Sequence, residues 1–216
     1  MSLFIRAAKC TACALLSVGA FVDNRPAVAE TPTADEAVEN GRMLPKTRAR
    51  LATGQPLKVV CFGDSVTGVY YHTGGRRAYT KTVGLALEQL YPNADITMVN
   101  AGISGHATDN ALQRIDNDVF EHDPQLVTVM YGLNDMVRVP LDAFHANLVE
   151  IVARCRSVGA EVLLCTPNSI LGTSSRPIEK LEQYCEAIRQ VGREQQVPVC
   201  DCYASYEALH REDPLA

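Results

Sequence analysis

"VVCFGDSVTG", which runs from Val59 to Gly68, joins an apolar stretch directly to glycine, aspartate and serine. The apolar residues from Leu57 to Phe62 predict a strand covered on both of its faces, because such strands read as nearly continuous hydrophobic runs. The small and polar residues after Phe62 indicate that the chain turns there. Ser65 is therefore expected at the tip of a strand, where its hydroxyl is a candidate nucleophile.

The alternation of apolar runs and helical patterns continues along the chain. Apolar runs predict five strands, at 57–62, 96–101, 125–132, 160–167 and 197–203. Apolar side chains at helical spacing predict helices at about 79–91, 111–119, 140–159 and 178–191, with short helices within 44–56 and around Glu207. Strands that alternate with helices in this way predict an α/β domain with a parallel sheet between two layers of helices.

Small and amide-bearing residues follow the first three predicted strands. The first strand leads into Gly63-Asp64-Ser65, the second into "NAGISGH" (100–106), and the third into "GLND" (132–135). Ligands of parallel sheets bind beyond the carboxyl ends of the strands, so these three clusters are expected to meet there. A hydroxyl, a glycine N–H and an amide side chain are the groups that acyl transfer needs.

The three clusters, in this order, resemble those of the SGNH hydrolases, also called the GDSL esterase/lipase family. "FGDSVTG" is similar to the first block of that family, "NAGISG" to the second and "YGLND" to the third. The resemblance implies that Ser65 is the nucleophile. It also implies that the backbone N–H groups of Ser65 and Gly105 and the side chain of Asn134 bind the oxyanion. A three-layer α/β/α, flavodoxin-like fold follows from it, with a five-stranded parallel sheet of order 2-1-3-4-5.

Some of these residues also have structural interpretations. Ser65 is a good helix N-cap residue, and Asn134 is common in turns. Asp64 and Asp135 are expected to brace their loops rather than to take part in the chemistry. The nucleophile elbow of the α/β-hydrolases, G-x-S-x-G, is excluded, because the second glycine here comes one residue too late.

The general base is harder to find in the sequence. In the resembled family, a histidine from an Asp-x-x-His-Pro block after the last strand activates the serine, and no such block follows residue 203. Because a serine without a base is a weak nucleophile, we expect an impaired enzyme whose domain, 57–216, is C-terminally incomplete. His210, with Asp213 three residues after it, is one substitute. The other histidines are His72 and His106 near the first two clusters, His122 at the expected opposite end of the sheet, and His145 within a helix.

The N-terminal residues resemble an export signal. Arg6 and Lys9 precede a short apolar run, and the small residues of "AVAE" predict cleavage after Ala29. An uncleaved N-terminal anchor is the alternative. We therefore predict a signal peptide at 1–29, a linker with a short helix at 30–56, and a secreted or periplasmic location. No later segment predicts a transmembrane helix.

Composition narrows the class of partner. The 216 residues carry a formal charge of -5 and no basic stripe, which argues against nucleic acid. Arg76 and Arg77 are expected to be solvated, with a role in holding an anionic substrate as the alternative.

Of the eight cysteines, two precede the cleavage site and six fall in apolar runs, which is typical of buried thiols. One disulfide among them is the alternative. The scattered histidines and cysteines predict no metal site, and no cofactor is expected.

These observations predict an exported serine esterase that cleaves acyl esters, with acetyl groups on carbohydrates as one substrate class. The alternative function is a non-catalytic domain that binds a glycan or an acyl ligand in the same pocket.

Overall fold

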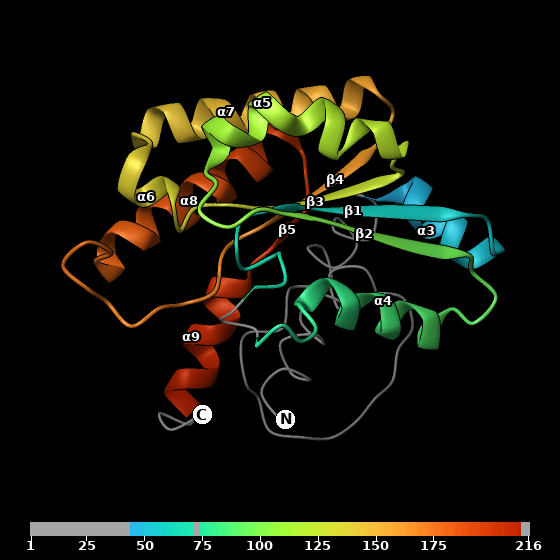
Figure 1. The fold of residues 1–216 in the computed structure, drawn as a ribbon, viewed down its shortest axis with the longest axis horizontal. Helices are drawn as coiled ribbons and strands as arrows, with labels where there is room; N and C mark the ends of the chain where they lie inside the picture. The colour runs from blue at the N-terminus through green and yellow to red at the C-terminus, as the bar shows by residue number, and fades with distance from the viewer. Residues whose placement is uncertain (1–43, 71–73, 213–216) are drawn as a thin grey trace.

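The computed structural model describes residues 44–70 and 74–212 and confirms the predicted α/β fold. Its five strands form one parallel sheet in the order β2-β1-β3-β4-β5, which is the order that the family resemblance implies (Figure 1). The strands are β1 (Leu57–Gly63), β2 (Ile96–Gly102), β3 (Leu126–Met130), β4 (Glu161–Cys165) and β5 (Val199–Cys200). The predicted signal peptide and most of the predicted linker lie outside the described residues.

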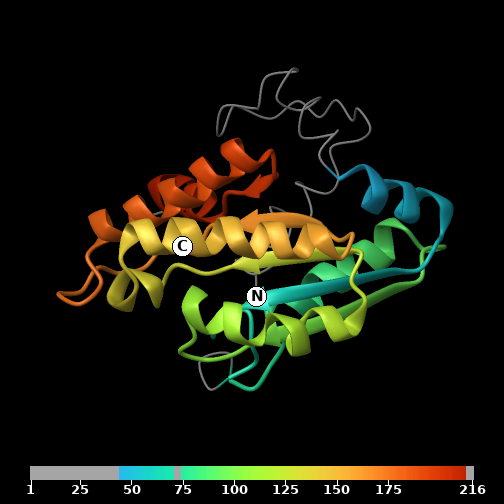
Figure 2. The same cartoon turned by 90° about the horizontal axis from the view of Figure 1, so that it is seen from above.

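Helices cover both faces of the sheet (Figures 1 and 2). One face carries α5 (Thr108–Asp118), α6 (Asp135–Arg138), α7 (Leu141–Ser157) and α8 (Ile178–Gln195). The other face carries α3 (Pro45–Thr53), α4 (Tyr79–Leu90) and α9 (Cys202–Glu212), and a short 3-10 helix, η2 (Phe120–His122), precedes β3. The short helix expected within 44–56 is thus confirmed as α3, which buries Leu51 against the sheet.

Alternate residues of each central strand enter two separate cores. In β1, Val60 and Phe62 pack with the core under α5, α7 and α8, whereas Val59 and Cys61 pack with the core under α3 and α4. All four side chains are buried, so the strand has no polar face. This is why the sequence of a central parallel strand shows a continuous apolar run instead of an alternating one.

The register of the sheet brings three strand ends to one level. Gly63, the last residue of β1, pairs with Gly102 at the end of β2 and with Met130 at the end of β3. The loops that follow these three strands therefore leave the sheet side by side. This is the edge at which the three sequence clusters were expected to meet.

The fifth strand is much shorter than predicted. The apolar run suggested 197–203, but β5 contains only Val199 and Cys200. Pro198 has no N–H for the ladder, and Asp201 accepts a hydrogen bond from the backbone N–H of Ala204 and so begins α9. The predicted third and fourth strands were too long at their ends, where the chain already turns into loops.

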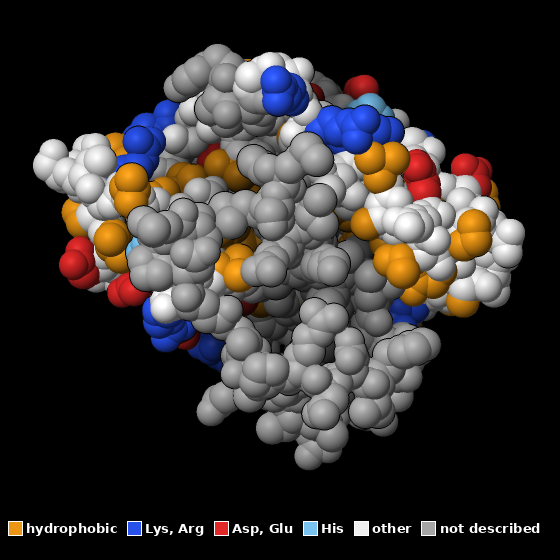
Figure 3. All heavy atoms as spheres, turned by 90° about the horizontal axis from the view of Figure 1, so that it is seen from below, with side chains coloured by type: hydrophobic (Ala, Val, Ile, Leu, Met, Phe, Trp, Pro, Cys, Tyr) orange, Lys and Arg blue, Asp and Glu red, His pale blue; other side chains and the backbone are white. Residues whose placement is uncertain are grey.

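All six cysteines within the described residues are buried and form no disulfide with one another, which confirms their interpretation as small hydrophobic side chains. None of the described helices combines the length and the apolar character that a membrane crossing requires. Seen from below, Lys and Arg side chains form small separate groups among acidic and hydrophobic ones (Figure 3). The described Lys and Arg side chains in this view do not join into one continuous stripe.

Candidate active site

Ser65 lies in a tight turn directly after β1. The carbonyl of Asp64 accepts hydrogen bonds from the N–H groups of Thr67 (3.2 Å) and Gly68 (3.1 Å), and its Oδ1 accepts one from the N–H of Val66 (2.8 Å). The aspartate therefore braces the turn, as predicted, and Ser65 is half-buried at its tip. The N-cap interpretation of Ser65 is wrong, because the next described helix, α4, begins fourteen residues later at Tyr79.

The second loop places Gly105 in a turn that favours glycine. The N–H of His106 donates to the carbonyl of Ile103 at 3.2 Å, which closes a four-residue turn. Gly105 occupies the third position of this turn with φ of 77°, in the left-handed region. The guanidinium of Arg138, from the end of α6, donates a hydrogen bond to the Gly105 carbonyl and holds the turn from outside.

Asn134 connects the first loop to the second. Its Nδ2 donates to Oδ2 of Asp64 at 3.3 Å and to the carbonyl of His106 at 2.9 Å. Asp64 is the neighbour of Ser65, and His106 is the neighbour of Gly105. The three residues predicted for the site therefore belong to three loops that one amide group joins.

Close backbone contact holds the first two loops together. The Nδ2 of Asn100 donates to the carbonyl of Thr67 (2.8 Å) and to the hydroxyl of Thr80 (3.1 Å). A Cβ atom on Gly102 would lie 2.2 Å from the backbone nitrogen of Gly68, so only glycine fits at the end of β2. The turn that contains Ser65 thus packs directly against the end of β2.

The buried carboxylate of Asp135 braces the third loop, as predicted. Its Oδ1 accepts hydrogen bonds from the N–H (2.8 Å) and the hydroxyl (2.6 Å) of Thr108, and its Oδ2 accepts one from the N–H of Gly132 (3.0 Å). Burial raises the pKa of this carboxyl, against the effect of these donors. The next residue after Asn134 is therefore fixed to the start of α5.

Arg114 is a residue of the site region that the sequence interpretation missed. Its guanidinium donates to the carbonyls of Ala101 and Gly63, both at 2.9 Å, and to the hydroxyl of Tyr131 at 2.7 Å. It also lies 4.4 Å from the ring centre of Phe62. One half-buried cation thus holds the ends of β1 and β2 and the residue after β3. The only signal in the sequence is its place three residues after Ala111, on the face that α5 buries.

The four described histidines have different surroundings. His106 adjoins the site through its backbone, and burial, followed by the charges of Arg114 and Arg138, lowers the pKa of its imidazole. His122 lies in η2, before β3, at the opposite end of the sheet as expected. His210 is exposed in the last turn of α9. His72 lies outside the described residues.

One Asp-x-x-His spacing, from Asp142 to His145, went unrecognised in the sequence. It lies in the first turns of α7 and is followed by alanine instead of proline. Nε2 of His145 lies 2.9 Å from Oε2 of Glu194 on α8, so this histidine faces the neighbouring helix. Within residues 44–70 and 74–212, no group of three His, Cys, Asp or Glu side chains is arranged to hold a metal ion.

The fold agrees with the class of protein that the family comparison shows, which is hydrolases that act on ester bonds. The chain belongs to the GDSL-like lipase/acylhydrolase family, whose model matches residues 61–215. It is 30% identical over 179 residues to the acetylxylan esterase of Geobacillus stearothermophilus, covering 72% of this chain and 80% of that protein.

Solved structures of that esterase have the same fold. One variant superposes with a TM-score of 0.64 at 25% identity, over 72% of this chain and 80% of that one. Another, described as a catalytic mutant in which a histidine is replaced by alanine, also has a TM-score of 0.64, at 26% identity and the same coverage. Further catalytic mutants of that esterase replace a serine or an aspartate, and the aspartate lies three positions before the histidine.

Proposed function

We propose that this protein hydrolyses short-chain acyl esters, acetyl esters of carbohydrates among them, with Ser65 as the nucleophile. Attack by the Ser65 hydroxyl forms a bond to the acyl carbon and places negative charge on the carbonyl oxygen. The N–H of Gly105 and Nδ2 of Asn134 are the proposed donors for that charge, together with the N–H of Ser65. The names of the related acetylxylan esterases support the acetyl substrate.

One observation carries the proposal. Nδ2 of Asn134 bonds both to Asp64, beside Ser65, and to His106, beside Gly105. We propose that an oxyanion formed at Ser65 accepts a hydrogen bond from this amide, which joins the loops that carry Ser65 and Gly105. Catalytic hydrogen bonds of free enzymes are often poorly aligned and become shorter in the complex with substrate.

The expected rate of ester hydrolysis depends on the group that accepts the proton of the Ser65 hydroxyl. Ser65 loses a proton as it attacks, and the leaving alcohol gains one, so an imidazole near neutrality serves both steps. In a related triad, loss of the histidine lowers the rate by about a millionfold, while the remaining groups still exceed water by about a thousandfold. We propose that residues 1–216 retain only this slow hydrolysis, and that an appended Asp-x-x-His-Pro segment restores the fast reaction.

Hydrolysis of p-nitrophenyl acetate tests the proposal. The 216-residue chain is compared with Ser65→Ala, Asn134→Ala and His210→Ala, and with Ser157→Ala as a matched control on the exposed end of α7. We expect Ser65→Ala to remove the slow rate and His210→Ala and Ser157→Ala to leave it unchanged. Retention of the rate in Ser65→Ala contradicts the nucleophile, and loss of a fast rate in His210→Ala identifies His210 as the base.

The cellular location is a separate proposal. The cationic start, the short apolar run and the small residues before Ala29 support export. Expression with residues 1–29 and detection of the N-terminus by mass spectrometry test it. A mature protein that begins at Glu30 is the expected result, and an intact Met1 in the cell pellet contradicts it.

A further inference from the structure

Four loops, not three, meet at the Asn134 side chain: its own loop and three others that contact it. Besides the bonds of Nδ2 to the first two loops, Oδ1 of Asn134 accepts a hydrogen bond at 3.3 Å from Nη2 of Arg176. Nε of the same guanidinium donates to the carbonyl of Leu133 at 3.1 Å. Arg176 comes from the loop between β4 and α8, which none of the three sequence clusters includes.

The backbone around Arg176 is itself held in a closed turn. The N–H of Arg176 donates to the carbonyl and to the hydroxyl of Thr173, both at 3.1 Å, and the N–H of Thr173 donates back to the carbonyl of Arg176 at 3.0 Å. Pro177 follows at the N-cap of α8, with a φ of -65° that its ring fixes. The half-buried guanidinium therefore extends toward Asn134 from a defined backbone position.

The partners of Asn134 determine which way its amide points. A guanidinium only donates hydrogen bonds, so the atom beside Arg176 must be the amide oxygen. A carboxylate and a carbonyl only accept, so the atom beside Asp64 and His106 must be the amide nitrogen. In the reverse orientation, the amide NH₂ would face the guanidinium of Arg176, and the amide oxygen would face the oxygens of Asp64 and His106.

Arg176 also changes the strength of the amide as a donor. A positive charge beside Oδ1 draws electron density toward the oxygen and away from Nδ2, which makes the N–H groups more positive. The arginine contacts the amide on the side opposite to Asp64 and His106, so its effect reaches the site through Asn134.

We propose that Arg176 is a positioning residue for the reaction: it fixes and polarises the Asn134 amide so that its N–H groups face the Ser65 and Gly105 loops. The proposal rests on the proposed function, because it assigns Arg176 to the oxyanion donor of that reaction. It predicts that Arg176 acts on the transition state, where the oxyanion exists, and hardly on substrate binding.

The kinetic test uses p-nitrophenyl acetate and residues 1–216. For Arg176→Ala we expect kcat to fall about tenfold with KM unchanged within about twofold, since removal of a whole oxyanion donor costs about 10²–10³. Arg176→Lys should recover part of the loss. In an Asn134→Ala background, Arg176→Ala should cost nothing further, because the group that it positions is absent. Losses that multiply, or a change confined to KM, overturn the proposal.

A second readout does not depend on activity. The Asn134 side-chain amide is identified in ¹H–¹⁵N spectra as the signal pair that Asn134→Asp removes, and the exchange of its protons with solvent is measured. We expect exchange to become faster by about tenfold in Arg176→Ala, because one of the three contacts that hold the amide is lost. The matched control is Arg193→Ala, an exposed arginine of α8 that pairs with Glu186, and it should change nothing.

The two readouts separate the two proposals. If the chain hydrolyses no faster than Ser65→Ala, the proposed function fails, while the exchange measurement still decides whether Arg176 holds the amide. If hydrolysis needs Ser65 and Asn134 but neither kcat nor proton exchange responds to Arg176→Ala, the role of Arg176 alone is wrong.

Discussion

Oδ1 of Asp135 accepts two hydrogen bonds from the single residue Thr108, one from its N–H at 2.8 Å and one from its hydroxyl at 2.6 Å. Thr108 begins α5, and the residue before it, Ala107, has no side-chain acceptor for the free N–H groups of the helix start. The carboxylate of Asp135, at the start of α6, thus caps α5 in its place. Asp135 also directly follows Asn134. The start of α5 and the candidate site therefore depend on one buried carboxylate.

Asp135→Asn should destabilise the fold. An amide in place of the carboxylate directs an NH₂ group at one of the three buried donors, most directly at the N–H of Gly132. We expect a loss of about 2 kcal/mol in the free energy of unfolding, the usual cost of a buried donor left without an acceptor. Urea unfolding followed by circular dichroism measures it. Asp142→Asn, at an exposed position of α7, is the control and should change stability by less than about 0.5 kcal/mol. Equal stabilities of the two variants would contradict the role of Asp135.

Gly102→Ala should damage both the fold and the Ser65 turn. The new Cβ would lie 2.2 Å from the backbone nitrogen and 2.7 Å from the Cα of Gly68, and backbone at the end of a central strand has little room to move. We expect destabilisation of about 2 kcal/mol or more, with loss of p-nitrophenyl acetate hydrolysis. Gly159→Ala separates the steric effect from backbone strain, because Gly159 has φ of 83° but open space around it. It should cost about 1 kcal/mol and leave hydrolysis intact. Unimpaired hydrolysis by Gly102→Ala would show that the close contact is not needed.

The buried thiols should resist modification in the folded protein. Burial raises the pKa of Cys61, Cys155 and Cys185 to about 12 in each case. At pH 8 the thiolate fraction is then about 10⁻⁴, and the thiolate is the reactive form. Ellman's reagent followed by peptide mass spectrometry should leave these three cysteines unmodified in the native state and label them in guanidinium chloride. Labelling of any of them within minutes in the native state would show that the cores open easily.

The sheet was predictable because each central strand is buried on both faces. The strand from Leu126 to Met130 has no exposed residue, and its sequence is apolar apart from the buried Thr128. The helices between the strands keep their own spacing of apolar side chains. The strand order came from the family resemblance, since the apolar pattern alone does not distinguish one parallel order from another. The shortness of β5 was not predictable from hydrophobicity, because Val197 and Tyr203 are buried without being paired in the sheet.

The candidate site was predictable in its parts but not in its connections. Ser65, Gly105 and Asn134 stand in recognisable local patterns at strand ends. Arg114 and Arg176 act on residues far away in the sequence, and an arginine in an amphipathic helix or a loop is usually solvated. Which carbonyl each guanidinium reaches depends on how helices pack on the sheet, which no local pattern encodes.

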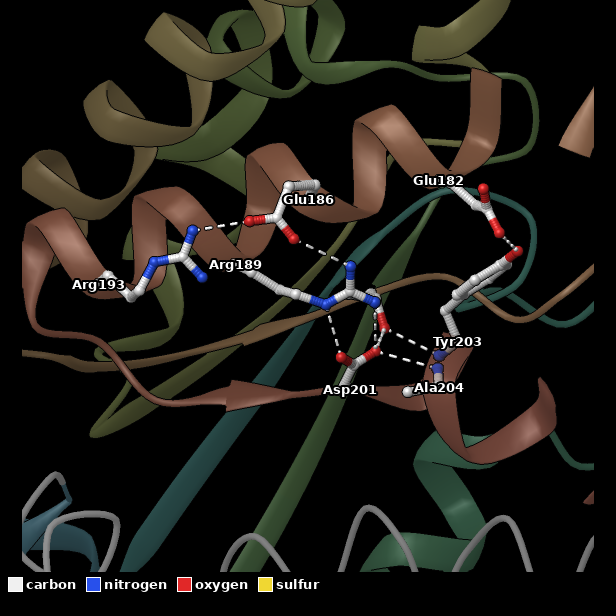
Figure 4. Close-up of polar contacts among 8 residues, drawn as sticks. Glu182, Glu186, Arg189, Arg193, Asp201, Tyr203 and Ala204 are labelled. Carbon is white, nitrogen blue, oxygen red and sulfur yellow. Dashed lines mark hydrogen bonds and ion pairs between the residues drawn. The ribbon is translucent and has the colours of Figure 1, made fainter. Parts of the chain in front are cut away.

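The start of α9 depends on a pair of charged groups whose contribution should vary with pH. Nε of Arg189 donates to Oδ2 of Asp201 at 2.7 Å, and Oδ1 of Asp201 accepts from the hydroxyl of Thr166 (2.9 Å) and the N–H of Ala204 (3.1 Å) (Figure 4). Burial alone would raise the pKa of Asp201, but these donors and the charge of Arg189 outweigh it, and the pKa is lowered. The ionised carboxylate therefore ties α8 and the end of β4 to α9.

Asp201→Asn should lower the free energy of unfolding by about 2 kcal/mol at pH 7, because the half-buried Arg189 loses the nearer of its two counter-charges and one oxygen becomes a donor. Since the pKa of Asp201 is lower in the folded protein than in the unfolded chain, its stabilisation is complete above the unfolded pKa of about 3.9 and is lost as the pH falls through the folded value. The difference between wild type and variant should therefore shrink below about pH 4 in urea titrations from pH 7 to pH 3. Glu186→Gln is the matched control: its side chain is 55% exposed, and such pairs contribute only about 0–1 kcal/mol. A difference that stays constant down to pH 3 would mean that the shape of the Asp201 side chain stabilises α9, and not its charge.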